Sequence, residues 1–364
     1  MSPGTERTPG PRIAVVGAGW AGLAAAWKLK QAGWRPDVFE QAPVLGGRAR
    51  KALIPRRKIV LDNGQHLMLG AYRQVLALMQ DIGIELDDAL LRLPLQLTTL
   101  DNQFGLRVNS ALPGPLRLPL ALLRLKGLTA REKFALCRAL FQLQVSAWRV
   151  APDQSVQAWL DAQRQPPALV HLFWTPLCVA TLNTPVAQAS MALFAGVLKD
   201  SLGAGPDACD LILPRVDLSA LWPQALTRHL RIHTNASVRG ITRTQYGYTL
   251  HSGQPANEDG RDKTASDRHA ETFDAVVLAT PPLICHRLLA PLSQDSAQSI
   301  SDSAGQVLHD AATQAAAKPH LLPEHSRIAP LLDQLQAFRY HAIATLTVFL
   351  AAPFPLADCM YMLN

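Results

Sequence analysis

The stretch Gly17-Ala18-Gly19-Trp20-Ala21-Gly22 decides the fold of this 364-residue chain. A short apolar run, Arg12–Val16, precedes it and predicts a buried strand. The small and apolar residues Trp20–Ala32 predict a helix that ends at Gly33. A second strand is predicted over Pro36–Phe39. The order strand, glycine turn, helix and strand predicts an α/β fold that begins with a parallel sheet.

The glycines and the helix together predict a dinucleotide site. Gly17 permits the tight turn, Gly19 lets the backbone approach a diphosphate, and Gly22 lets helix and strand pack closely. The helix start offers N–H groups and the positive end of its dipole to the anion. Glu40 ends the second strand, and its distance in sequence from Gly22 is close to the expected spacing of about 20 residues. A carboxylate at this position accepts hydrogen bonds from ribose hydroxyl groups. It would repel a 2′-phosphate, which argues against NADP. The predicted cofactor-binding residues here are Gly17, Ala18, Gly19, Trp20, Ala21, Gly22 and Glu40.

A second glycine motif, Gly46-Gly47-Arg48, follows shortly after Glu40. The two motifs together resemble the extended fingerprint of the glutathione-reductase-like flavoproteins, especially their amine-oxidase and phytoene-desaturase branch. The resemblance implies a Rossmann-like domain that binds FAD, with the paired glycines folded over the diphosphate. An Arg fork suits diphosphate oxygens, so Arg48 is expected near the phosphates. Further cofactor-binding positions implied by the resemblance are Val238, Ala279 and Thr280.

Three longer segments narrow the resemblance to one family. They are Leu61–Tyr72, Trp174–Pro185 and Asp210–Arg215. They are similar to the hydroxysqualene dehydroxylases, also described as squalene-associated FAD-dependent desaturases of hopanoid biosynthesis. The resemblance implies an oxidoreductase that reductively removes the hydroxyl group of hydroxysqualene and gives squalene.

The same resemblance assigns the residues around the Asn63-Gly64 turn. Gly64, Gln65 and His66 are implied to bind the cofactor. Asp62 and His66 are the candidates for the acid that assists the departing hydroxyl group. Two structural roles compete with catalysis: Asp62 capping a turn and His66 hydrogen-bonding the cofactor. No metal site is predicted.

The α/β patterns at both ends bracket a helical middle, which predicts a discontinuous first domain. The expected parts are a disordered tail (1–10), an FAD-binding domain (11–92 and 215–290), and a mostly helical or mixed substrate domain (93–214) to which 291–364 return. Within these parts we expect helices over Tyr72–Ile82, Thr129–Trp148 and Leu218–His229, a hairpin over Leu93–Val108, a polar surface excursion over Ser293–Lys318 and a strand over Ala342–Leu350.

The family that the chain resembles ends in a Gly-Asp-containing segment that reaches the flavin, followed by a closing helix. This sequence ends at Asn364 without that segment. We therefore expect that the chain is truncated or that its cofactor site is incomplete.

Composition and charge narrow the partners. The chain is 48% apolar and 17% charged, with a net charge of +7. These values exclude a disordered protein, and composition alone favours a leucine-rich helical core over a site for an apolar ligand. No nucleic-acid motif accompanies the positive charge, so nucleic acid is not predicted as a partner. A phosphorylated cofactor or an anionic membrane surface explains the charge equally well.

The expected location is cytoplasmic, with peripheral contact at the inner face of the cell membrane. The cysteines are 5, an odd number, and lie far apart, which favours a reducing compartment. The first residues lack the apolar region of a signal peptide, and no apolar run reaches the roughly 18 residues of a membrane span. The segment Leu112–Leu128 is apolar and basic, and is the expected membrane contact. Its prolines at 113, 115 and 119 predict a loop rather than a helix.

The sequence leaves two other functions open. The first is a flavoenzyme of the same superfamily that acts as a phytoene-type carotenoid desaturase or an amine oxidase. The second is a flavin-free, truncated remnant that serves as a binding protein. For the leading hypothesis the partner is a long apolar isoprenoid substrate, and the electron donor is unknown.

Overall fold

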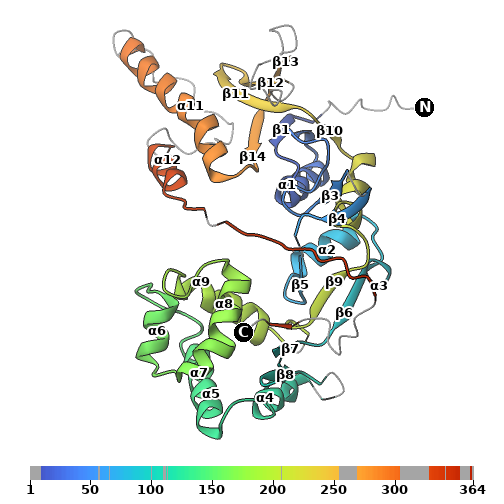
Figure 1. The fold of residues 1–364 in the computed structure, drawn as a ribbon. Coiled ribbons are helices and arrows are strands. Elements are labelled where there is room, and N and C mark those ends of the chain that lie inside the picture. Colours follow the sequence, from blue (N-terminus) through green and yellow to red (C-terminus); the bar gives the residue numbers. More distant parts are fainter. Residues whose placement is uncertain are drawn as a thin grey trace, which may run out of the picture. The chain divides into compact units, whose positions relative to one another are not determined.

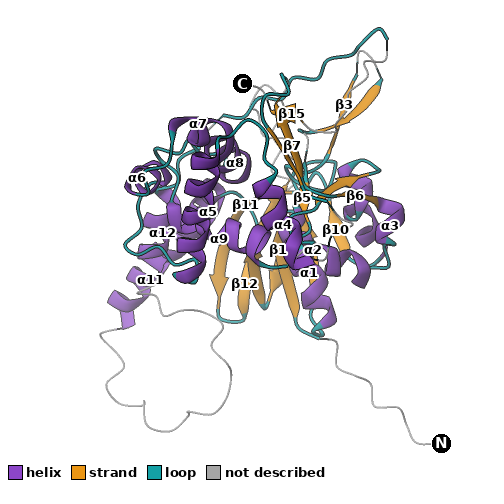
Figure 2. Ribbon diagram, turned by 90° about the horizontal axis from the view of Figure 1, so that it is seen from below, coloured by secondary structure: helices purple, strands orange, loops and turns teal. Residues whose placement is uncertain are grey.

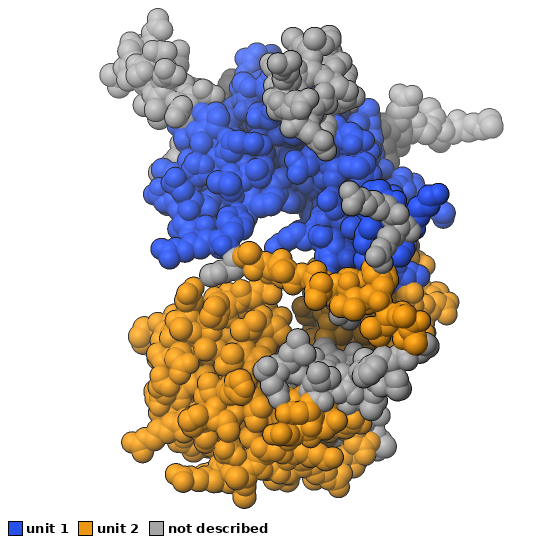
Figure 3. Space-filling model, in the orientation of Figure 1, with its two compact units in different colours: residues 1–64, 216–340 blue, residues 65–215, 341–364 orange. Residues whose placement is uncertain are grey.

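A computed structural model (Figure 1) describes residues 10–55, 58–64, 66–99, 101–109, 112, 114–205, 207–253, 269–303, 328–340, 342–352 and 361–362. The chain forms two compact units, residues 1–64 with 216–340 and residues 65–215 with 341–364 (Figure 3). The domain boundaries expected from the sequence stay predictions, and most of the expected disordered tail lies outside the described residues. In the part of the chain described here, no helix has the length and apolar character needed to cross a bilayer.

A four-stranded parallel sheet in the order β10-β2-β1-β14 organises the first unit. Its strands are β1 (Arg12–Val16), β2 (Arg35–Phe39), β10 (Arg231–His233) and β14 (Ala275–Leu278). The helix α1 (Trp20–Gln31) connects β1 to β2 and packs against both. From Ile13 to Val16, β1 is buried, because it pairs with β2 on one side and β14 on the other. The predicted strand, turn, helix and strand are confirmed.

The first unit contains further helices and strands besides this sheet. An antiparallel sheet packs its apolar side chains Val238, Ile241, Leu250 and Phe273 against Ala14, Val16 and Phe39. The strands of this antiparallel sheet are β11 (Ser237–Thr244), β12 (Gly247–Gly253) and β13 (His269–Phe273). The other elements of the first unit are β3 (Lys51–Ile54), β4 (Ile59–Asp62), α10 (Leu218–Leu221), a 3-10 helix (Pro223–Arg228), α11 (Pro282–Ser303) and α12 (Ile328–Gln336).

The second unit begins and ends in short strands. β9 (Leu211–Pro214) pairs with β5 (Met68–Leu69) and β6 (Leu90–Leu93), and β7 (Gln96–Thr99) pairs with β8 (Gly105–Arg107) and β15 (Tyr361–Met362). The β7–β8 pair confirms the hairpin expected over Leu93–Val108. Two helices, α2 (Arg73–Asp81) and α3 (Leu86–Ala89), lie between β5 and β6 in sequence.

A cluster of helices forms the rest of the second unit (Figure 2). It contains α4 (Gly114–Leu123), α5 (Ala130–Val145), α6 (Val156–Ala162), α7 (Pro167–Leu169), α8 (Thr175–Leu182), α9 (Met191–Leu198) and two π-helical turns, Val170–Trp174 and Lys199–Gly203. Trp174 lies at the centre, fully buried, and makes edge contacts with Trp159, Phe173 and Phe194. Its indole N–H donates to Oε1 of Gln165 at 3.0 Å, which satisfies the one polar atom of the ring.

Three sequence-based predictions are wrong in detail. A loop was expected around the prolines, but the structure has the helix α4 there, with Pro119 inside it. A proline in the first turn of a helix costs no helical hydrogen bond, so only Pro119 removes a hydrogen bond from α4. The helix expected over Leu218–His229 is divided at Trp222, because Pro223 starts a separate 3-10 helix. The surface excursion expected from Ser293 begins as the second half of α11, and 304–327 lie outside the described residues.

The strand expected over Ala342–Leu350 is also wrong, because the structure assigns no strand to residues 342–352. Its apolar side chains are exposed, and Leu346 is 87% exposed. A β-prone composition does not make a strand unless the backbone pairs with a neighbouring edge.

Candidate functional site

The glycine turn lies between the ends of three strands of the parallel sheet. The N–H of Gly17 donates to the carbonyl of Phe39 at 2.8 Å, and the N–H of Ala279 donates to the carbonyl of Val16 at 2.8 Å. Gly17 has a φ of +104°, which a larger residue adopts only under strain, and a Cβ on it would lie 2.7 Å from the carbonyl oxygen of Ala279. The turn at Gly17 therefore requires glycine for conformation and for space.

Gly22 serves the packing of α1 on the turn. A Cβ on this residue would overlap the carbonyl oxygen of Gly17 and would lie 3.1 Å from the side chain of Ala279. Gly19 differs, because the nearest atom to a Cβ there is the Cα of Gly47, at an ordinary contact distance of 3.8 Å. Among the described residues, no atom lies close enough to exclude a side chain at Gly19, so the packing leaves room for a ligand at this position.

Glu40 is buried at the end of β2, with 8% of its surface exposed. Its Oε2 accepts the N–H of Ala18 at 2.8 Å, and its Oε1 accepts the N–H of Ala42 at 2.9 Å. The carboxylate thus holds the glycine turn and the loop after β2 together. Each oxygen keeps a second lone pair, so the side chain can still accept hydroxyl groups of a ribose.

The second glycine motif folds back onto the first. The N–H of Gly46 donates to the carbonyl of Ala18 at 2.9 Å, and a Cβ on Gly47 would lie 2.9 Å from the Cα of Gly19. The carbonyl of Arg48 accepts from Nδ2 of Asn63 at 3.1 Å, which fastens the loop to the end of β4. The Arg48 side chain is exposed, and within the described residues its guanidinium makes no ion pair.

The start of α1 is open to an anion. Gly19 occupies the N-cap position, and among the residues that the structure describes no side chain caps the helix and no acidic side chain lies in its first turn. The rings of Trp20 and Trp222 meet edge to face at this start, with centroids 5.2 Å apart. Backbone N–H groups at an uncapped helix start attract diphosphate oxygens.

The three cofactor-binding positions implied further along the chain also lie in the first unit. Val238 is buried in β11, two residues after Ala236, whose N–H donates to the Glu40 carbonyl at 2.9 Å. Ala279 directly follows β14 and lies against Gly17. The hydroxyl group of Thr280 lies 3.2 Å from Sγ of Cys285 at the start of α11.

The segment that carries the candidate acids is divided between the units. Oδ1 of Asp62 accepts the N–H of Leu218 at 2.8 Å, which is a capping contact across 156 residues of sequence. Gly64 ends the first unit, Gln65 lies outside the described residues, and His66 belongs to the second unit. The catalytic roles of Asp62 and His66, and the cofactor contact of Gly64, stay predictions.

Sequence reasoning missed three residues of this site. Ala42 donates the second hydrogen bond to Glu40, and Trp222 walls the start of α1. The hydroxyl of Ser219, fully buried, donates to the carbonyl of Leu45 at 3.1 Å and accepts the N–H of Lys51 at 3.1 Å. No local signal could have found these residues, since each acts through a partner far along the chain or through its backbone.

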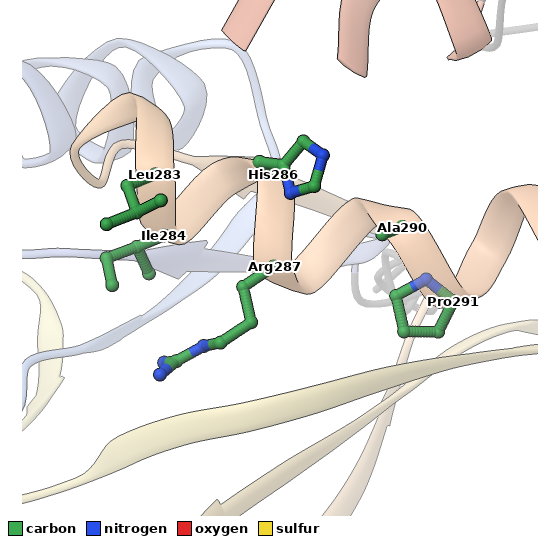
Figure 4. A pocket seen from close by; sticks show the side chains of 6 residues that line it. All are labelled: Leu283, Ile284, His286, Arg287, Ala290 and Pro291. Carbon is green, nitrogen blue, oxygen red and sulfur yellow. The ribbon is translucent and has the colours of Figure 1, made fainter. Parts of the chain in front are cut away.

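The linings of two pockets include none of the residues of the glycine turn. One, of about 540 Å³, follows the first half of α11 and is lined by Leu283, Ile284, His286, Arg287, Ala290 and Pro291 (Figure 4). His286 and Arg287 project to different sides of the helix there. The other, of about 380 Å³, lies beside α2 in the second unit and contains the ion pairs Arg117–Asp207 (2.6 Å) and Arg92–Asp210 (3.3 Å) at or next to its lining. Burial raises the pKa of Asp210.

The residues of the turn fit the diphosphate and a ribose of a dinucleotide. The start of α1 is uncapped, and Gly19 and Gly47 have no side chains. Arg48 adds a cation next to Gly47 in the sequence, and Glu40 adds a carboxylate that is bonded to Ala18. The helix start, the glycines and Arg48 suit an anion such as a diphosphate, and the Glu40 carboxylate suits hydroxyl groups.

Comparisons with known proteins agree with a flavin-binding family. The model of the family described as flavin containing amine oxidoreductase matches residues 20–350. A hydroxysqualene dehydroxylase of Rhodopseudomonas palustris is 27% identical over 306 residues, which are 77% of this chain and 64% of that protein. A hydroxysqualene dehydroxylase of Zymomonas mobilis is 26% identical over 209 residues, which are 56% of this chain and 46% of that protein. The chain thus spans less than two thirds of the length of these relatives.

The solved structure of an oxidoreductase from Methanosarcina mazei superimposes with a TM-score of 0.53 at 16% identity, covering 81% of this chain and 65% of the other. At this identity the superposition shows the fold alone. It confirms the predicted α/β class.

Proposed function

The chain belongs to the flavin containing amine oxidoreductase family, and on that premise we propose that it is the FAD-dependent enzyme that converts hydroxysqualene to squalene. Because the chain belongs to this family, it is a flavin-dependent oxidoreductase. The similarity to hydroxysqualene dehydroxylases over 77% of the chain is the observation that carries the substrate. The proposed cofactor is FAD rather than FMN, because Glu40 and the glycine turn suit the ribose and diphosphate of a dinucleotide.

The reaction replaces a hydroxyl group by hydrogen, so it consumes two electrons and two protons and releases water. When bound, reduced flavin supplies the hydride for such a step. The two electrons come from a reductant of the cell.

The residues of the first unit bind and orient the cofactor in this proposal. The N–H groups at the start of α1 and the Arg48 guanidinium hold the diphosphate. Glu40 holds the ribose and keeps the turn in place through Ala18. Gly19 and Gly47 let the diphosphate approach the backbone.

The remaining task is the departure of hydroxide, which a proton donor must assist. Asp62 and His66 are the proposed donors. Oδ1 of Asp62 accepts a backbone N–H, which fixes the carboxyl group and leaves Oδ2 for a proton. Asp62→Asn and His66→Gln are expected to lower kcat more than flavin content, whereas loss of flavin in either variant would assign that residue to cofactor binding.

Flavin binding is tested through Gly19. We expect the wild-type protein to carry flavin absorbance and to release FAD on denaturation. Gly19→Ala adds a Cβ at an ordinary contact distance from the chain, so the fold survives while the diphosphate approach is obstructed. We expect at least tenfold weaker flavin binding with an unchanged unfolding midpoint. FMN in place of FAD, or wild-type affinity in Gly19→Ala, would contradict the proposed site.

The substrate is tested with the purified protein and chemically reduced flavin. Hydroxysqualene, phytoene and a primary amine are supplied separately, and the products are identified by mass spectrometry. Squalene from the first substrate alone supports the proposal. Desaturated carotenoid or aldehyde instead would establish the other flavoenzyme activities, and flavin bound to the purified protein would exclude the flavin-free binding protein.

A further inference from the structure

The helix α5 is apolar on two opposite faces. Leu136, Ala139 and Leu143 are buried in the core of the second unit. Phe134, Phe141 and Val145 repeat at the spacing of one helical face on the other side. These three side chains are exposed by 70%, 66% and 69%. We call Phe134, Phe141 and Val145 the α5 apolar stripe.

A further apolar side chain is exposed at the end of α4, which adjoins α5. Nζ of Lys133 on α5 donates to the carbonyl of Leu123 at 2.9 Å, and Leu123 is 61% exposed. The two helices are in contact and are neighbours in Figure 1. Single exposed apolar residues are ordinary, but three on one helical face with a fourth on the adjoining helix expose an unusual amount of apolar surface to water.

The segment that carries the stripe is strongly basic. Between Arg117 and Arg149 the sequence contains 7 Lys and Arg residues and a single carboxylate, Glu132. Glu132 is engaged in a capping box with Thr129, where its Oε2 accepts the Thr129 N–H at 2.7 Å. Arg117 is paired with Asp207. Arg124, Lys126, Arg131 and Arg138 are exposed.

We infer that the face made by the α5 apolar stripe, Leu123 and these exposed cations lies on the surface of an anionic lipid bilayer. Phe and Leu side chains enter the boundary between head groups and acyl chains, while Lys and Arg remain at the level of the phosphates. A protein partner of ordinary composition does not require such a one-sided charge. This inference keeps the end of the segment Leu112–Leu128, where the sequence placed the membrane contact, and extends the contact to α5.

The inference does not rest on the proposed reaction, because binding to vesicles requires neither flavin nor substrate. It is tested by co-sedimentation of the full chain with vesicles of phosphatidylcholine alone and of phosphatidylcholine mixed with phosphatidylglycerol. One variant, Phe134→Gln with Phe141→Gln, removes apolar surface and keeps good helix formers. A second, Arg124→Gln with Arg131→Gln, removes two exposed charges.

Tyr246→Gln is the matched control, since Tyr246 is 80% exposed on a hairpin of the other unit. Circular dichroism and the thermal midpoint establish that each variant is folded.

We expect binding to the anionic vesicles that weakens in high salt, and little binding to phosphatidylcholine alone. Each removed charge is expected to weaken binding about fivefold, so that the double Arg variant loses roughly 25-fold. The double Phe variant is expected to lose at least tenfold, and Tyr246→Gln nothing.

Two results would overturn the inference. One is wild-type protein that stays in the supernatant with anionic vesicles. The other is a folded double Phe variant that sediments as the wild type does. A change of oligomeric state in that variant, without a change in vesicle binding, would assign the stripe to a second copy of the chain and would equally refute the inference.

Discussion

Oε2 of Glu40 accepts a hydrogen bond from the backbone N–H of Ala18 at 2.8 Å, and this contact joins the end of β2 to the glycine turn. The same carboxylate that is expected to hold a ribose therefore also shapes the loop expected to hold the diphosphate. Binding and stability are coupled through one side chain, and a substitution there changes both.

Glu40→Gln is expected to destabilise the protein. The amide keeps one oxygen acceptor and turns its NH₂ group toward the second backbone donor, so one buried N–H, of Ala18 or Ala42, loses its partner. The expected loss in the free energy of unfolding is about 1–3 kcal/mol, with weaker flavin binding. Urea unfolding and flavin titration measure the two effects. The control Asp88→Asn changes an exposed carboxylate and is expected to stay within about 0.5 kcal/mol of wild type.

Gly22→Ala is expected to be more harmful than alanine at another helical glycine. The added Cβ overlaps the carbonyl oxygen of Gly17, which forces α1 away from the turn and costs about 1–3 kcal/mol or more. Gly196 in α9 has open space around the position of a Cβ, so Gly196→Ala is expected to raise stability by about 0.5–1 kcal/mol. Thermal unfolding of both variants makes the comparison. Equal midpoints would show that α1 does not depend on close contact at Gly22.

Asp153 supports the start of α9 in a pH-dependent way. Its carboxylate accepts the hydroxyl group of Ser190 at 2.7 Å and the N–H of Ala192 at 3.0 Å, and these bonds lower the pKa of Asp153 below its ordinary value of 3.8. The folded state therefore binds this proton less tightly than the unfolded state. Its stabilisation is present above that value and is lost as the pH falls through the lowered pKa.

Asp153→Asn is accordingly expected to unfold at a lower temperature than wild type at neutral pH. The difference between the two is expected to shrink as the pH falls from 3.8 through the lowered pKa, because the unfolded chain takes up the proton first and the folded protein follows. Scanning calorimetry across this range measures the gap. A gap that stays constant with pH would show that the charge of Asp153 contributes nothing.

The cysteines are expected to differ in reactivity. Cys178 and Cys209 are buried, and burial raises the pKa of both thiols, so little thiolate is present to react. Cys137 on α5 is half-buried and reaches solvent. In a Cys359→Ser background, we expect one rapid reaction with a thiol reagent in the native protein, and three further reactions on unfolding. The rapid phase should disappear in Cys137→Ser, and its persistence would refute the assignment.

Local patterns predicted the parts of the structure that local chemistry determines. The glycine turn, α1 and the hairpin β7–β8 each follow from residues within one short segment. The exposure of Phe134 was not predictable, because helical spacing identifies a second apolar face but not whether another element covers it. The role of Asp62 was likewise undetermined, since its partner Leu218 lies 156 residues away. The exposure of Phe134 and the hydrogen bond of Asp62 both depend on tertiary partners rather than on local propensity.

The pairing of β1 with β14 has a consequence for biosynthesis. The backbone N–H of Arg12 bonds to the side chain of Asp274, 262 residues later, and β14 begins at the next residue. At about 5–20 residues per second, a ribosome needs on the order of 10–50 s to make the intervening chain. During that time β1 has an open, apolar edge of the kind that recruits other nascent chains. Shielding of that edge during translation is therefore expected to raise the yield of folded protein, and slow elongation lengthens the exposure.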